Sequence, residues 1–123
     1  MAQGSDAVAF LDLHPINEGH TLVVPRKHTT SISEVDEVAA VAMWSLARRI
    51  AAGLRVSGLR CEAINLFLAD GAADGQEVFH SHLHVIPRWQ GDGFGIKFPP
   101  HYGAAADRKT LDDIAARLRK RIS

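Results

Sequence analysis

The chain has 123 residues, of which 46% are hydrophobic, and its 14 basic and 14 acidic side chains give a formal net charge of zero. This length predicts one domain over residues 1–123, and the balanced charge gives no argument for binding to nucleic acid or to a membrane surface. The single cysteine, Cys61, excludes an intrachain disulfide and is typical of the reducing cytoplasm, where we expect the protein. No apolar run approaches the roughly 18 residues of a membrane span, and the first residues lack a secretory signal pattern.

The first half of the chain predicts a strand pair followed by a long helix. After a short, frayed segment at 1–6, residues 8–12 and 20–25 have the composition of strands, and a turn containing Pro15, Asn17 and Gly19 separates them. Residues 31–54 predict a helix, because a serine can cap its start and apolar residues recur at helical spacing. Its expected core stripe is Val35, Val38, Ala42, Leu46 and Ile50. This helix should cover one face of a sheet and leave the other face free.

The second half predicts two more strands and a short last helix. Residues 62–68 and 80–86 have strand composition, and Pro87, which lacks an N–H, should close the second of them or sit at its edge. The glycine-rich segment 90–95 reads as a flexible turn. A helix from about Thr110 has one apolar face, made of Leu111, Ile114, Leu118 and Ile122. Together these elements predict an α+β fold with an antiparallel sheet of four to five strands, one long helix on one face and a short C-terminal helix.

Three histidines at alternate positions dominate the fourth strand. His80, His82 and His84 should share one face of a strand, because successive side chains point to opposite faces. The turn at 74–76 precedes them, with backbone amides free to meet an anion. This pattern indicates phosphate chemistry or a metal site.

Three interpretations of the histidines stay open at this point. Ordinary structural histidines are one, although three in five residues, out of seven in the chain, argue against it. A zinc site with three imidazoles and a water is another, but positions i and i+4 of a straight strand lie ~13 Å apart and strain to reach one ion at ~2 Å. In the third, one imidazole attacks phosphorus and a neighbour protonates the leaving group.

The histidine segment resembles the signature of a known family. Residues 80–86, His-Ser-His-Leu-His-Val-Ile, are similar to the His-x-His-x-His pattern of the histidine-triad (HIT) family, and so are the flanking pairs 75–76 and 87–88. The segment 19–25, followed by His28, also resembles the family. The resemblance runs from about residue 8 to 88, with 89–123 as a C-terminal extension and helix. It implies the HIT-like fold and a homodimer.

The resemblance also implies a mechanism. His82 would attack the α-phosphorus of a purine nucleotide and form a covalent nucleotidyl-histidine, and His84 would protonate the leaving group. His80 would orient His82, His20 would support this network and help fix the tautomers, and Gln76 would hold phosphate oxygens. No cofactor or metal would be required.

The expected substrate site lies near the first strand. By resemblance, Phe10 and Leu13 line the base pocket, and Asp12 accepts hydrogen bonds from the ribose hydroxyls. Asn65 is either a satisfied buried amide or a site residue that braces a catalytic imidazole. The implied substrates are nucleoside phosphoramidates or nucleotidyl esters. The alternatives are a dinucleoside polyphosphate hydrolase, and a nucleotide-binding or interaction module with slow turnover.

Some positions depart from the family pattern. The N-terminal segment is short, and the Cys-x-x-Cys of some members is missing. Ala69 stands where many members have an amide, Glu77 where some have a hydroxyl, and Ser81 where an apolar residue is usual. These departures bear on substrate affinity and identity more than on the chemistry.

Overall fold

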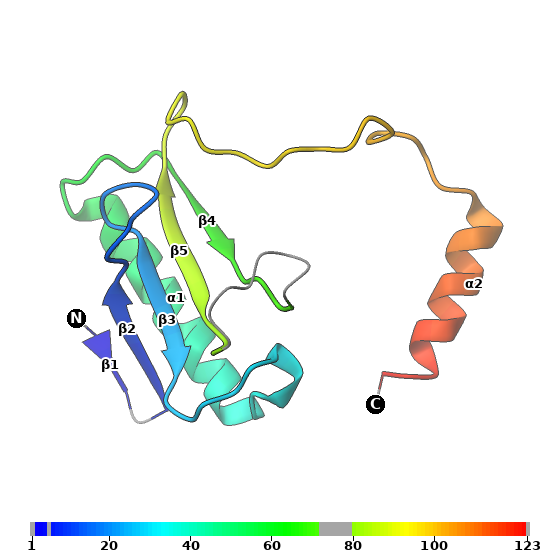
Figure 1. Ribbon diagram of the computed structural model, residues 1–123, viewed down its shortest axis with the longest axis horizontal. Helices are drawn as coiled ribbons and strands as arrows, with labels where there is room; N and C mark the ends of the chain where they lie inside the picture. The colour runs from blue at the N-terminus through cyan, green and yellow to red at the C-terminus, as the bar shows by residue number, and fades with distance from the viewer. Residues whose placement is uncertain (1, 5, 72–79, 123) are drawn as a thin grey trace.

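The sheet has five strands in the order β1-β2-β3-β5-β4, and every neighbouring pair is antiparallel (Figure 1). This computed structural model describes residues 2–4, 6–71 and 80–122. The strands are β1 (Ala2–Gln3), β2 (Ala7–Leu11), β3 (Thr21–Pro25), β4 (Ala63–Phe67) and β5 (Leu83–Arg88). The α+β fold with an antiparallel sheet is as the sequence predicted. The expected fraying of residues 1–6 is wrong for β1, which pairs with Val8 and Ala9.

The long helix starts later than the sequence predicted, because two capping residues compete for its start. Ser31 caps only a 3-10 turn, η1 (Ile32–Glu34), and the backbone of Val35 is then extended. Helix α1 (Glu37–Val56) begins after Asp36, whose Oδ1 accepts a hydrogen bond from the Ala39 amide at 2.8 Å. A carboxylate N-cap at this position satisfies one of the free amides of the first turn, and its negative charge interacts favourably with the positive end of the helix dipole.

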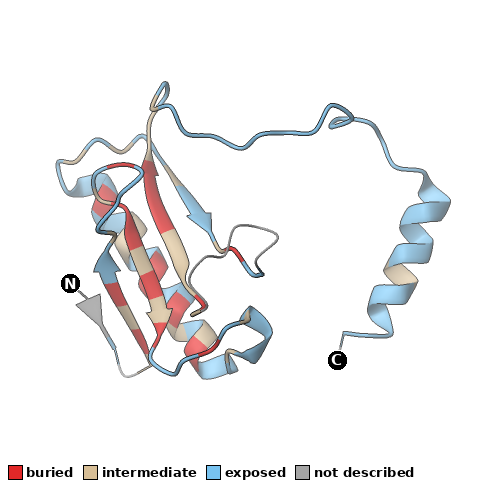
Figure 2. Cartoon of the chain, in the orientation of Figure 1, coloured by how far each residue is buried: buried red, intermediate tan, exposed pale blue. Residues whose placement is uncertain are grey.

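The hydrophobic core lies between α1 and one face of the sheet. Buried and less buried residues alternate along β2 and β3, as Figure 2 shows, so one face of each strand meets the helix. The core consists of Ala7, Ala9, Val23 and Val85 from the sheet and Met43, Leu46, Ala47 and Leu54 from α1. Burying this apolar surface holds α1 on one side only. In the part of the chain that the structure describes, no helix covers the opposite face (Figure 1).

Strand β5 begins at Leu83 rather than at His80, and Pro87 is its last residue but one, at a position where β5 has no strand partner on the β3 side. Pro87 is buried and pairs with Ile64 of β4, whereas β3 pairs with β5 only as far as Val85. The N and O of one strand residue point to the same side, and the Pro87 oxygen accepts a hydrogen bond from the Asn17 side chain. The missing N–H of Pro87 therefore faces the turn before β3, where no strand needs it.

The last helix, α2 (Arg108–Arg119), stands away from the sheet at the end of an extended segment (Figure 1). Asp107 caps its first turn, and none of its residues is buried. The apolar face that the sequence predicted is present but exposed, at Leu111, Ile114 and Leu118. No helix in the described part of the chain combines the length and apolar character needed to cross a membrane.

Candidate functional site

The catalytic candidates gather on the sheet face opposite α1. His84 lies on β5 between Leu22 of β3 and Phe67 of β4 in the strand register. His82 comes just before the strand, and its ring lies 4.9 Å from that of His84, centroid to centroid, in an edge-on arrangement. The two imidazoles thus lie side by side although only one of them belongs to the regular strand.

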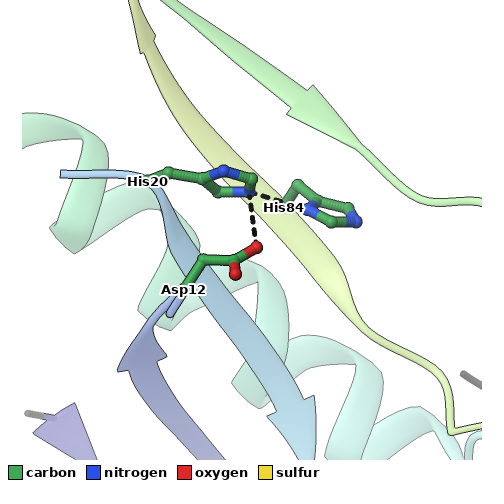
Figure 3. Close-up of side chains that lie close together, drawn as sticks. All are labelled: Asp12, His20 and His84. Atoms are coloured by element: carbon green, nitrogen blue, oxygen red, sulfur yellow. Dashed lines mark hydrogen bonds and ion pairs between the residues drawn. The ribbon is translucent and has the colours of Figure 1, made fainter. Parts of the chain in front are cut away.

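His20 is the buried end of a short hydrogen-bonded chain. It is 2% exposed, and its Nε2 lies 2.8 Å from Nδ1 of His84 (Figure 3). Its Nδ1 accepts a hydrogen bond from the Ile16 backbone amide at 3.0 Å. Because a backbone amide can only donate, the neutral His20 ring carries its proton on Nε2 and donates it to His84 Nδ1. The proton of neutral His84 is then on Nε2, the nitrogen that points away from His20 in Figure 3.

The same reasoning assigns the tautomer of His82. Its Nδ1 lies 2.7 Å from the backbone oxygen of His80. A carbonyl oxygen can only accept, so His82 Nδ1 carries the proton and Nε2 keeps its lone pair. A neutral imidazole with a free nitrogen lone pair is the form that attacks an electrophile.

His80 forms a second histidine pair, with His28, at the edge of the site. Its Nε2 donates to the Pro25 oxygen at 3.1 Å, and its Nδ1 lies 3.2 Å from Nδ1 of His28. The expected contact between His80 and His82 is made by the His80 backbone oxygen, while the His80 ring bonds elsewhere. His28 had no predicted role, and the resemblance of the segment around it was the only signal for it.

Burial keeps the imidazoles of His20 and His84 neutral. It lowers the pKa of His84 to about 4, helped by the neighbouring His82 and His20 rings, while the Asp12 carboxylate works in the opposite direction. Burial also lowers the pKa of His20, against the same opposing effect of Asp12. Both rings are therefore neutral at pH 7 in the free protein, as the tautomer assignment requires.

A cavity of about 300 Å³ opens beside the triad. Its lining consists of Phe10, Leu22, Val24, His80 and His82. The volume is at the lower end of the range for small-molecule sites. Phe10 is therefore at the site, as expected, whereas Leu13 is 85% exposed and does not line the cavity. Leu22 and Val24 also line the cavity but were not predicted as site residues. They alternate with the buried residues of β3, so a period of two along this strand could have placed them on the face of the site.

The polar residues expected to bind substrate lie in different surroundings. Asp12 follows β2, and its Oδ2 lies 3.5 Å from His20 Nε2, while its Oδ1 accepts from the His14 amide. Asn65 is exposed, and its side chain accepts a hydrogen bond from Arg88 rather than contacting an imidazole. Gln76 lies outside the described residues, as does Glu77.

A metal ion has one candidate group of donors in the part of the chain that the structure describes. Atoms of Asp12, His20 and His84 lie within 4.8 Å of one another. However, the His20 Nε2 proton is directed at His84 Nδ1, so an ion would have to displace this hydrogen bond. The three triad histidines do not converge, because both ring nitrogens of His80 face His28 and Pro25.

Comparisons with known proteins agree on the type of domain. The model of the HIT domain family matches residues 2–91. An uncharacterized HIT-like protein of Borreliella burgdorferi is 43% identical over 91 residues, which cover 73% of this chain and 66% of that protein. The matches span only 60–67% of the length of five such relatives, including that one.

Solved structures give the same result for the fold. A HIT family protein from Bacillus anthracis has a TM-score of 0.89 and 30% identity, with 100% of this chain and 86% of that chain covered. A histidine triad nucleotide-binding protein from Candida albicans has a TM-score of 0.84, with 98% and 85% covered. At 22% identity, the second likeness concerns the fold alone.

Proposed function

Because this chain belongs to the HIT domain family, we propose that it is a nucleotide-binding hydrolase that cleaves at the α-phosphate of a purine nucleotide. The observation that carries the proposal is the pair of complementary tautomers. His82 has a free lone pair on Nε2, and the adjacent His84 carries a proton on its own Nε2. A nucleophile and a proton donor side by side are what displacement at phosphorus needs.

The reaction has two displacements. The lone pair of His82 Nε2 forms a bond to the α-phosphorus, and the bond from phosphorus to the leaving nitrogen or oxygen breaks. The leaving group takes the Nε2 proton of a His84 ring that has taken up a second proton after substrate binding, so a neutral imidazole remains. Water then attacks the nucleotidyl-histidine and gives its proton to His84, which releases the nucleoside monophosphate and restores both histidines.

The proton that His84 gives up must be acquired after substrate binds. In the free protein burial keeps the pKa of His84 at about 4. The negative charge of a bound phosphate favours the protonated imidazole and raises this pKa. In the free protein His20 donates to Nδ1 of neutral His84, which places the single His84 proton on Nε2.

The binding roles proposed for the other residues follow from their positions. Phe10 lines the cavity beside the triad and supplies an apolar wall for a purine. Asp12 is partly buried next to His20 and is the proposed acceptor for the ribose hydroxyls. The roles of Gln76 at the phosphate, and of Leu13 and Asn65 in substrate binding, stay predictions.

We also propose a homodimer in the cytoplasm that needs no metal or other cofactor. The apolar face of α2, at Leu111, Ile114 and Leu118, is exposed in the single chain, as is Ile122 just beyond the helix, and this supports an association with a second copy. A metal is not needed because the nucleophile and the proton donor are both protein groups.

The test is release of AMP from an adenosine phosphoramidate by the purified chain, with acid-quenched samples examined by mass spectrometry. We expect turnover and a nucleotidyl adduct on the peptide that contains His82. A strong preference for dinucleoside polyphosphates would indicate a dinucleotide hydrolase instead. Nucleotide binding without turnover or adduct would contradict the proposed hydrolase and leave a binding module.

A further inference from the structure

The turn that carries His20 is tied to the far end of β5 by one buried side chain. Asn17 is 7% exposed, and its Nδ2 donates to the Pro87 oxygen and to Asp92 Oδ2, both at 2.9 Å. A side-chain amide nitrogen has two hydrogens, so both donors of Asn17 are used. The turn is thus attached to a strand residue and to a loop residue that lie 70 and 75 positions away in the sequence.

The same turn sets the state of the His20 ring. The His20 amide donates to the Asn17 backbone oxygen at 3.0 Å, and the Ile16 amide donates to His20 Nδ1 at 3.0 Å. The second of these bonds is the one that assigns the His20 proton to Nε2. Any shift of the Asn17 segment therefore moves the donor that selects the His20 tautomer.

Asp92 is a rigid anchor for Asn17. Its side chain is 2% exposed, and Arg88 donates to both of its oxygens, through Nε to Oδ2 and through Nη2 to Oδ1. The backbone amides of Trp89 and Phe94 add two further donors. These hydrogen bonds, Arg88 first, hold the pKa of Asp92 well below its usual range, so the carboxylate is a permanent acceptor. The sequence had indicated only a flexible turn here.

Close packing also limits the turn at Gly19. This residue has φ +100°, a conformation that favours glycine. A Cβ at this position would lie 3.0 Å from carbons of Leu54 and Leu59 and 3.4 Å from Pro87 Cγ. The turn therefore rests directly on the core and on the strand residue that Asn17 holds.

We propose that Asn17 and Asp92 are positioning residues, which hold the Ile16 amide against His20 Nδ1 so that His20 presents its Nε2 proton to His84. This inference rests on the proposed hydrolase function for its kinetic consequence. Neither residue is expected to touch the substrate. They act through the hydrogen-bonded series from Asp92 to Asn17, the turn, His20 and His84.

The experiment compares Asn17→Ala, Asp92→Ala and Asp92→Asn with the parent chain. Nitrogen-15 NMR of the imidazoles reports the tautomer of His20, and kinetics with an adenosine phosphoramidate separates kcat from KM. For the two alanine variants we expect a mixture of His20 tautomers and a kcat lower by roughly 10- to 100-fold, the cost of misplacing a catalytic group. KM should change by less than about 3-fold, because the lost bonds do not reach the substrate. The kcat of the double alanine variant should be no lower than that of the slower of the two single alanine variants, because both residues act in one network.

Two variants, one of them new, separate positioning from stability. Asp36→Ala removes the N-cap of α1, on the other face of the sheet, and should lower stability while leaving the His20 tautomer and kcat unchanged. Asp92→Asn keeps an acceptor for Asn17 and should fall between Asp92→Ala and the parent. If Asn17→Ala does not fold, Asn17→Ser, which retains one donor, replaces it with an intermediate effect expected.

Two results would overturn the inference. One is an unchanged His20 tautomer in the Asn17→Ala and Asp92→Ala variants. The other is that these two variants lose no more kcat than Asp36→Ala does when all are compared at the same loss of stability. If the parent chain shows no turnover, the proposed function fails, but the NMR comparison still decides whether Asn17 and Asp92 control His20.

Discussion

Two pairs of histidines join the β3 side of the sheet to the triad segment, and they differ in their surroundings. The inner pair, His20 and His84, has a nitrogen–nitrogen distance of 2.8 Å, and the outer pair, His28 and His80, has 3.2 Å. His20 is 2% exposed and has Asp12 beside it, whereas His28 is exposed. The same contact between imidazoles thus occurs once around a buried histidine and once around an exposed one. Burial, rather than the pairing itself, is therefore what distinguishes the inner pair, and the proposed proton transfer depends on it.

The largest expected effect is at His82, which lies between the two pairs. Its ring contacts His84, and its Nδ1 proton is held by the His80 backbone. His82→Asn should lower the rate of AMP release by about 10³-fold or more, because loss of a nucleophile costs several kcal/mol of barrier. Nucleotide binding, measured by calorimetry, should persist. A variant within a few fold of the parent rate would show that no covalent step occurs at this residue.

Matched glutamine variants of the two pairs test the comparison directly. His20→Gln should lower kcat by about 10- to 100-fold, at or below the lower end of the range for positioned proton transfer, because a glutamine amide can turn its oxygen as well as its nitrogen toward His84 Nδ1 and so no longer fixes the His84 proton on Nε2. His28→Gln should change kcat by less than about 3-fold, because His28 contacts His80 at the exposed edge. Equal losses in the two variants would mean that burial does not distinguish the pairs.

Asp12 lies next to His20 of the inner pair and is the proposed acceptor for the ribose hydroxyls. A 2′-deoxy substrate should lose a charge-assisted hydrogen bond worth about 1.5–3 kcal/mol, which is roughly 10- to 100-fold in kcat/KM. Comparing ribose and deoxyribose forms of adenosine and guanosine phosphoramidates measures this loss, and Asp12→Ala should abolish the preference. Equal kcat/KM for ribose and deoxyribose in the parent chain would remove Asp12 from its assigned role. We expect little discrimination between the two bases, because apolar contacts to a purine tolerate either.

The inner pair should also make stability depend on pH. The pKa of His84 is about 4 in the folded chain and 6.5 unperturbed, and that of His20 is lowered as well. Between these values the unfolded chain binds more protons, so stability is full above about pH 6.5 and is lost as the pH falls toward 4. Solvent around the partly exposed His84 ring screens the effect, which leaves about 1–2 kcal/mol.

Urea unfolding at several pH values, on the parent and on His84→Asn, measures this contribution. The variant should lose less free energy of unfolding on acidification than the parent, with an unchanged slope against urea. If both chains lose the same amount, the His84 imidazole is not the group that responds.

The smallest expected effect concerns metal. Dialysis against a chelator should leave turnover unchanged, because the proposed nucleophile and acid are His82 and His84 themselves. Activity that disappears with chelator and returns with zinc would favour a metal mechanism at Asp12, His20 and His84. Zinc binding without an effect on the rate would not favour a metal mechanism, since imidazole clusters bind such ions readily.

The sequence alone was sufficient wherever the decisive contacts are local. The composition of residues 20–25 predicted strand β3, and helical spacing predicted α1 and the apolar face of α2. The two-residue spacing of His82 and His84 indicated that their rings lie close together, as they do, and the catalytic role of this segment stays a prediction. The error at the start of α1 is of the same local kind, since both Ser31 and Asp36 are competent caps.

Only the tertiary structure decided the states of these groups. The tautomer of His84 follows from a contact between residues 64 positions apart, and the anchoring of the His20 turn depends on Asn17 and Asp92, which are 75 positions apart. Likewise, the exposure of Leu13 and the pairing of His28 with His80 follow from how the strands are laid side by side. Hydrogen-bond partners and desolvation depend on which distant segments meet, and residue periodicity carries no information about that. The sequence therefore determined which chemical groups are available, and folding determined which of them carry a proton and where.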